Sequence, residues 1–347
     1  MRTVSRIGVR TSARRVLPAV AGAAVLVVLV ARLGAGPFLH ALSGATAPAL
    51  ALALALGAWT TVLSARRWVR AARVLGLPLP AARALSEYYA AIFLNAVLPG
   101  GVLGDVRRAA LHGRDAGRIR AATGALLLER SAGQVVLVVA AATVWLVHPV
   151  GVPGPGRAWR AVAAVLGIAA LGAALAVWPR LGPVLPPLRG RDVAALLGSS
   201  VAALCGHVAM FVLAARTAGV TIPVVALLPL ALVALLAMSL PFNLAGWGPR
   251  EGATAWAFGS AGLGAGQGVT VAVLYGLFAL VAGLPGALVL LGRRSVPVRP
   301  SQEALGSLER LGPLEPGRQP VPQQDQVVDP ADAGQHSAPV VVRGQPA

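Results

Sequence analysis

The chain has 347 residues, of which 56% are apolar and 12% are charged, and its mean hydropathy is +0.74. Soluble domains usually carry about 25% charged residues, so this composition excludes an ordinary soluble fold and favours a protein whose solvent is a lipid bilayer. All 30 basic residues are Arg, and residues 1–292 hold 24 of them with six acidic residues, whereas residues 293–347 hold six of each. The net charge of +18 therefore belongs to the apolar part of the chain.

The Arg residues lie at the ends of apolar runs, as in the positive-inside pattern of membrane proteins. Nucleic-acid binding needs a basic face on a soluble surface, so we expect no nucleic-acid partner. The single cysteine, Cys205, excludes a disulfide or a thiolate metal cluster within the chain. The sequence contains no phosphate-binding loop, zincin pair or nucleophile elbow, and we expect no cofactor.

Six or seven stretches are long and apolar enough to cross a bilayer, which takes about 20 residues. They are Val16–Leu33, Thr46–Leu63, Thr123–Val147, Ala158–Trp178, Val193–Ala215, Ile222–Leu240 and Val269–Leu291. The basic loops predict a multi-pass protein of the plasma (inner) membrane with both termini in the cytoplasm. An even number of crossings then requires part of Ala253–Leu263 to cross as well, which makes about eight crossings in an all-α fold.

Three regions follow from this pattern. Residues 1–15 form a basic cytoplasmic N-terminus, and residues 16–294 form the transmembrane domain. Residues 295–347 are rich in Pro, Gln, Gly and charge, and such a segment buries too little apolar surface to offset its ordering entropy. We therefore predict a disordered polar tail.

Two apolar stretches, Tyr88–Leu103 and Leu240–Gly264, are interrupted by Pro and Gly. Such interruptions break a helix, and broken backbone at membrane depth survives only where protein buries it or a wet cavity accepts it. Both stretches are predicted to be re-entrant or discontinuous helices. Because both sides of the first stretch are basic, it is predicted to enter and leave on the cytoplasmic side. Two matching breaks in two halves of a chain favour an inverted repeat around a shared site.

The breaks carry the candidate site residues, because ionisable groups inside a membrane are costly and usually functional. The first break contains Asn95, Pro99, Gly104, Asp105 and Arg107; the second contains Asn243, Trp247, Arg250 and Glu251. Exposed backbone N–H groups beside an Arg fork suit an anion. The alternative for the first break is an interfacial turn capped by Asp105, and for the second an ordinary loop ion pair.

A third charged pair, Glu129 and Arg130, lies within an apolar run. Neighbouring residues of a helix point about 100° apart, so these two need separate partners. Glu129 is expected to pair with Arg107 or Arg250, and snorkelling near a helix end is the alternative. In the resulting hypothesis, Arg107 and Arg250 contact a lipid phosphate in one cavity, and Asp105, Glu129 and Glu251 hold those Arg side chains when the site is empty.

The two broken segments resemble the flippase-like transmembrane domain of the lysylphosphatidylglycerol synthase family. The family motifs are matched by Asn95, Leu98-Pro99, Gly104-Asp105, Arg107, Glu129-Arg130, Pro241 and the run from Gly246 to Gly252, with Leu103 in place of a family glycine. The resemblance covers roughly Thr46 to Arg294. In two-part synthases this domain is thought to move aminoacylated phospholipid between leaflets, and a separate cytosolic domain, which has no counterpart here, transfers the aminoacyl group.

The resemblance therefore implies the transport half alone. The leading expectation is a lipid transporter or flippase-like protein, not an enzyme, that binds an anionic or phosphate-bearing headgroup and has a lipid-modifying enzyme as a candidate partner. One alternative is a membrane-embedded transferase acting on a lipid-linked substrate, although its usual outward-loop carboxylates are missing from residues 33–45 and 148–156. The other is a non-transporting scaffold for lipid-synthesis enzymes.

Overall fold

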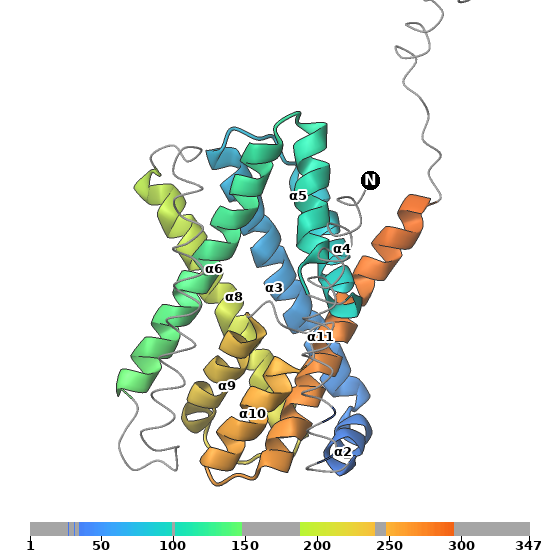
Figure 1. Ribbon diagram of the computed structural model, residues 1–347, viewed down its shortest axis with the longest axis vertical. Coiled ribbons are helices and arrows are strands. Elements are labelled where there is room, and N and C mark those ends of the chain that lie inside the picture. The colour runs from blue at the N-terminus through green and yellow to red at the C-terminus, as the bar shows by residue number, and fades with distance from the viewer. Residues whose placement is uncertain are drawn as a thin grey trace, which may run out of the picture. The chain divides into compact units, whose positions relative to one another are not determined.

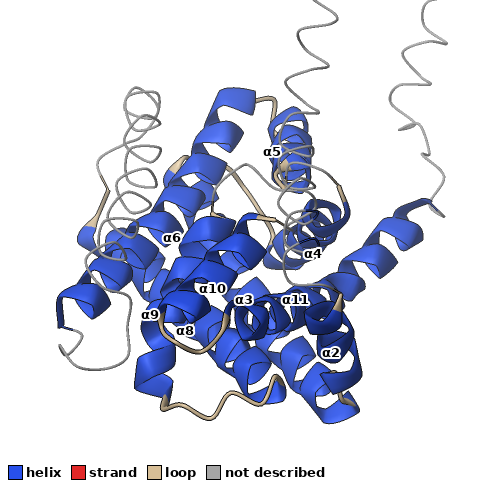
Figure 2. Ribbon diagram, turned by 60° about the horizontal axis from the view of Figure 1, so that its bottom comes forward, coloured by secondary structure: helices blue, strands red, loops and turns tan. Residues whose placement is uncertain are grey.

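The computed structural model describes residues 35–98, 101–147, 188–239 and 248–294, together with Val27 and Ala31. Within these ranges the secondary structure is entirely helical, and Figure 2 shows the helices joined by short loops. The predicted segments Val16–Leu33 and Ala158–Trp178, and the tail, lie outside the described ranges apart from Val27 and Ala31. The polytopic helical class is confirmed.

Four of the described helices are long and apolar enough to cross a membrane. They are α3 (Ala47–Val74), α6 (Ile119–Val147), α8 (Gly190–Thr217) and α11 (Ala265–Arg294). Each has 28 to 30 residues, which at 1.5 Å per residue exceeds the ~30 Å of a bilayer core. The four correspond to the predicted spans Thr46–Leu63, Thr123–Val147, Val193–Ala215 and Val269–Leu291, and each is longer than its prediction.

The first broken stretch is a helical hairpin. α4 (Ala81–Val97) ends at the predicted break, and α5 (Leu103–Asp115) begins after it. Gly101 in the turn has φ +61°, a conformation that a residue with a Cβ rarely adopts. The two helices pack against each other, and the outer ends of both lie at the top of Figure 1. The predicted break and the return to the side of entry are confirmed.

The second broken stretch belongs to a hairpin of the opposite orientation. α9 (Val224–Met238) rises from the bottom of Figure 1 to about mid-height, and α10 (Pro249–Ser260) returns to the bottom. Their 15 and 12 residues span roughly 22 and 18 Å, so neither crosses a bilayer alone. The predictions of spanning helices over Ile222–Leu240 and through Ala253–Leu263 are therefore wrong; apolar composition does not reveal that the helices stop halfway. A short helix, α2 (Gly36–Gly44), lies at the same end.

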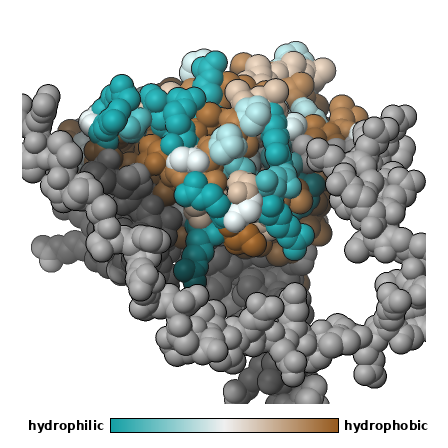
Figure 3. Space-filling model, turned by 90° about the horizontal axis from the view of Figure 1, so that it is seen from above, coloured by the Kyte–Doolittle hydropathy of each residue, from teal (hydrophilic) through white to brown (hydrophobic). Residues whose placement is uncertain are grey.

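Charge is distributed unequally between the two ends of the bundle. The end where α3 and α5 stop and α4, α6 and α8 start, called the basic end below, carries Arg66, Arg70, Arg73, Arg83, Arg114, Arg118, Arg120, Arg189 and Arg191. At the opposite end, Arg216 is the only charged side chain in the described ranges. Hydrophilic side chains gather on the basic end in Figure 3. The positive-inside rule predicts that this end faces the cytoplasm.

Small residues let the helices approach closely. A Cβ placed on Gly104 of α5 would lie 2.2 Å from the Ala91 carbonyl oxygen of α4, and one on Gly286 of α11 would lie 2.1 Å from the Tyr89 carbonyl oxygen. Association of helices in lipid depends on such close packing, because apolar burial there gains nothing over the lipid tails. Gly104 therefore lets α5 pack closely against α4, and Gly286 lets α11 do the same.

We predict that Gly104→Ala destabilises the protein, because the new methyl group overlaps the backbone of α4. Overpacking of this kind costs about 1–3 kcal/mol, which should appear as a lower melting temperature by circular dichroism in detergent. Gly190→Ala on α8 is the control, since a Cβ there meets no atom within 4 Å. Equal melting temperatures for both variants would contradict the close approach.

Candidate functional site

Glu129 of α6 is the centre of a buried ion-pair network between α3, α4, α5 and α6. Its side chain has no exposed surface. Oε1 accepts hydrogen bonds from Nε and Nη2 of Arg67 at 3.0 and 2.6 Å, and from the Tyr88 hydroxyl at 3.1 Å. Oε2 accepts from Nη2 of Arg108 at 2.8 Å. Two guanidinium groups on one carboxylate leave an excess positive charge that a second acid offsets.

That second acid is Asp105, in the first turn of α5. Its Oδ1 accepts from Nε of Arg108 at 2.8 Å, and Oδ2 accepts from Nδ2 of Asn95 at 2.9 Å and pairs with Arg130. The side-chain Oδ1 of Asn95 in turn accepts from the Gly104 backbone N–H at 2.7 Å. Asn95 thus fastens the end of α4 to the start of α5. Three Arg side chains share two carboxylates, so the network retains a net positive charge.

Aromatic rings enclose Arg108. Its guanidinium carbon lies 4.6 Å from the Trp68 ring centroid and 4.4 Å from that of Tyr88, a geometry that favours a cation over each ring. His112 meets the Trp68 ring edge-on at 5.6 Å. Burial lowers the pKa of the His112 imidazole, so a neutral ring at pH 7 adds no further positive charge beside Arg108. The enclosure leaves the Arg108 side chain with no exposed surface.

The pairing of Glu129 differs from the expectation. Neither Arg107 nor Arg250 contacts it; Arg67 and Arg108 take their place. Arg107 instead bonds Glu87 of α4 at 2.9 Å and is about one-third exposed. The prediction that Glu129 and Arg130 have separate partners is confirmed, since Glu129 binds Arg67 and Arg108 whereas Arg130 binds Asp105.

The second break carries its own buried pair at the start of α10. Glu251 Oε2 accepts from the Gly248 backbone N–H at 2.6 Å, and Oε1 accepts from Nε of Arg250 at 2.9 Å. Both side chains are buried. The Arg250 guanidinium carbon lies 5.5 Å from the Tyr275 ring centroid, and the Tyr275 hydroxyl is 3.2 Å from His207 Nδ1. Glu251 thus caps α10 and neutralises Arg250 at once.

The predicted site residues fall into three groups. Asn95, Gly104, Asp105, Glu129 and Arg130 meet in the network around Glu129; Arg107, Arg250 and Glu251 form separate pairs; and Pro99, Asn243 and Trp247 lie outside the described residues. The sequence patterns did not indicate four further residues of these interactions: Arg67, Arg108, Tyr88 and Glu87. Arg108 had a detectable signal, because it stands three residues after Asp105 and therefore shares its helix face. Arg67 had none, since its partner lies 62 residues away.

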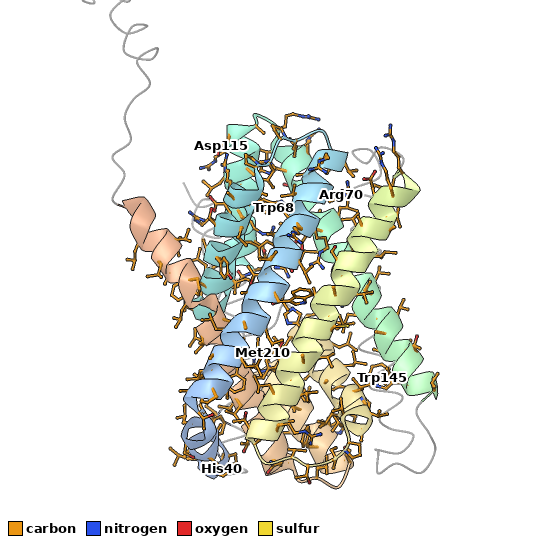
Figure 4. The ribbon with its side chains drawn as sticks, turned by 180° about the vertical axis from the view of Figure 1, so that it is seen from behind. His40, Trp68, Arg70, Asp115, Trp145 and Met210 are labelled. Atoms are coloured by element: carbon orange, nitrogen blue, oxygen red, sulfur yellow. The ribbon has the colours of Figure 1, made fainter. Side chains whose placement is uncertain are left out.

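A cavity of about 770 Å³ opens between α3, α4 and α8, beside the network. Arg66, Arg67, Arg70 and Arg73 are among its lining residues, whereas Arg107 and Arg250 are not. Figure 4 shows Arg70 and Trp68 in the upper part of the bundle, on α3.

We predict that Glu129→Gln lowers stability markedly, because Arg67 and Arg108 lose their shared counter-charge inside the protein. Breaking a buried ion pair costs about 3–5 kcal/mol, measurable as a fall in melting temperature in detergent. The matched control is Asp115→Asn, which removes the exposed pair with Arg83 and should cost less than about 1 kcal/mol. Similar losses in the two variants would show that the network is not a stabilising centre.

Comparison with known proteins gives one finding. Residues 15–286 match the family model described as the lysylphosphatidylglycerol synthase TM region. No curated protein and no solved structure matches the chain. The match includes every candidate residue of both hairpins.

Proposed function

The chain belongs to the lysylphosphatidylglycerol synthase TM family, and on that premise we propose that it is a flippase-like lipid transporter. It binds an anionic or phosphate-bearing headgroup within the membrane and moves the lipid between leaflets without catalysing a chemical reaction. The observation that carries the proposal is a pair of hairpins from opposite ends of the bundle, in each of which a carboxylate in the first turn of the returning helix forms a buried pair with an Arg of the same helix. Charges kept at membrane depth are a mark of transport pathways.

Matching helix contacts in the two halves support an inverted repeat, the architecture that gives alternating access to such a site. If α3–α6 are exchanged with α8–α11, each helix contact of one half has a counterpart: α3–α4 corresponds to α8–α9, α5–α6 to α10–α11, and α4–α11 to α9–α6. Asp105 and Glu251 are the third residues of α5 and α10. Transporters built from such repeats expose a central site to each side in turn by moving one half against the other.

The repeat extends to the residues behind the hairpins. Glu129 and Tyr275 each stand eleventh in their helices, α6 and α11. Glu129 bonds Arg67 of α3, and Tyr275 lies within hydrogen-bond distance of His207 of α8, the helix that corresponds to α3. At this position the half containing α3 has a charged pair, Glu129 and Arg67, whereas the other half has Tyr275 and His207. This asymmetry supports different roles for the halves, a fixed charged half and a more easily rearranged neutral one.

In the proposed cycle, Arg107 and Arg250 bind the headgroup phosphate, because a guanidinium fork bonds phosphate oxygens in pairs and stays charged. At rest each has a carboxylate partner, Glu87 for Arg107 and Glu251 for Arg250. A phosphate can therefore take the place of the carboxylate on each guanidinium, and the displaced carboxylate then takes up a proton or pairs with another cation, because a bare charge in the membrane is costly. Asp105 and Glu129 hold Arg67, Arg108 and Arg130 and so keep the first hairpin in position.

The test is movement of fluorescent phosphatidylglycerol in reconstituted vesicles, read by dithionite quenching of outer-leaflet dye. Arg250→Ala and Arg107→Ala are each expected to slow translocation about tenfold or more, which corresponds to the loss of one charge-assisted contact of about 1.4 kcal/mol. Arg250→Lys should fall between wild type and Arg250→Ala, because it keeps the charge and loses the fork.

Arg114→Ala is the control, since Arg114 is exposed at the basic end and is outside the proposed pathway. Circular dichroism of each variant establishes that it is folded. Translocation at the wild-type rate in both Arg107→Ala and Arg250→Ala would mean that these residues are structural and the proposed site is wrong.

The orientation is a separate prediction. In a Cys205→Ala background, a single cysteine from Arg73→Cys should react with a membrane-impermeant maleimide only after the cell is permeabilised, and one from Ser260→Cys should react in intact cells. Both positions are exposed and lie at opposite ends of the bundle. Labelling of the Arg73→Cys variant in intact cells would reverse the orientation.

A further inference from the structure

The cavity between α3, α4 and α8 is lined by Arg side chains that do not belong to the ion-pair network. Arg67 at its base is bound by Glu129 and by the Ser200 hydroxyl, and Arg70 is paired with Asp192 at 3.6 Å. Arg66 and Arg73 are exposed, and no described acidic side chain lies within ion-pair distance of either. Two positive charges therefore face the cavity without a partner in the described ranges.

The cavity is polar at one end and apolar at the other. Its wall on α3 runs from Val62 to Arg73, roughly 16 Å along the helix. Arg66, Arg70 and Arg73 are spaced four and three residues apart and so share one face near the basic end. Val62 and Leu63 line the part nearer the membrane centre, and Leu85 of α4 lies opposite. The gradient matches a phospholipid, whose phosphate lies at the interface and whose chains lie deeper.

Small residues on α8 make the room. Ala195, Gly198, Ser199 and Ala202 form this wall, and a Cβ on Gly198 would meet no atom within 4 Å. Elsewhere in the bundle glycines admit a neighbouring helix, as at Gly104 and Gly286. Gly198 admits no described neighbour, so its missing side chain leaves a space.

We infer that this cavity binds one anionic phospholipid, with the headgroup phosphate against Arg66 and Arg73 and an acyl chain along α3 and α8. Basic pockets between membrane helices on the side of the positive residues suit anionic headgroups. The chain's own termini do not complement it, since residues 1–15 carry five Arg and no acid and residues 293–347 carry as many Arg as acids. The inference goes beyond the proposed function and stands without it, because binding here requires no transport.

The test is native mass spectrometry of the purified full chain titrated with phosphatidylglycerol or with phosphatidylcholine of the same acyl chains. One phosphatidylglycerol should bind saturably and more tightly than phosphatidylcholine. The double variant Arg66→Gln/Arg73→Gln should weaken its binding about tenfold. The control Arg114→Gln/Arg120→Gln removes the same charge at the same end and should change binding less than about twofold, since these residues are outside the cavity.

A second pair of variants tests the apolar part. Gly198→Phe should fill the cavity and lower phosphatidylglycerol binding about tenfold, whereas Gly190→Phe, also in open space on α8, should leave it unchanged. Equal binding in wild type and in Arg66→Gln/Arg73→Gln, an equal loss in the charge control, or displacement of the lipid by millimolar inorganic phosphate would each overturn the inference. Vesicles that show no lipid movement while one phosphatidylglycerol still binds would refute the transport proposal alone.

Discussion

A charge inside a bilayer needs an opposite charge within hydrogen-bond reach, because removing an ion from water costs several kcal/mol that only pairing offsets. The fold around Glu129 follows from this constraint. One carboxylate with no exposed surface accepts hydrogen bonds from α3, α4 and α5. Moving any of these helices away breaks one of these bonds, and moving α3 or α5 away also removes an Arg from its buried counter-charge. In lipid, where apolar contact between helices gains little, such a centre fixes the first hairpin more firmly than its apolar surface does.

The second hairpin is held by a different balance of forces. Arg250 and Glu251 are neighbours in one helix and pair with each other, and the Arg250 guanidinium also faces the Tyr275 ring of α11. Small side chains pack α10 closely against α11. Gly268 of α11 shows this, because a Cβ there would lie 2.5 Å from the Thr254 carbonyl oxygen. One hairpin is thus anchored by ion pairs to other helices, and the other mainly by close packing.

Sequence patterns predicted the long spanning helices and both breaks, because length, apolarity and Pro/Gly interruptions are local properties. They did not predict that α9 and α10 stop halfway, since residues 222–263 are apolar enough for a span. Ion-pair partners were the main failure. Arg107 and Arg108 are adjacent, and their side chains point about 100° apart around the helix, so only one of them can face the network. In the structure it is Arg108 that pairs with Glu129. The pairing of Arg67 with Glu129 depends on how α3 meets α6, which no local pattern encodes.

The opposed hairpins have an electrostatic consequence. α5 and α10 both begin near mid-height and run to opposite ends, so both direct the positive ends of their peptide dipoles, worth about half a charge each, toward the membrane centre. Asp105 and Glu251 stand in those first turns and offset this field while they are ionised. Because Arg108, Arg130 and Arg250 already pair with these two carboxylates, the helix ends add to an excess of positive charge near the membrane centre, so the potential there favours an anion and opposes a small cation.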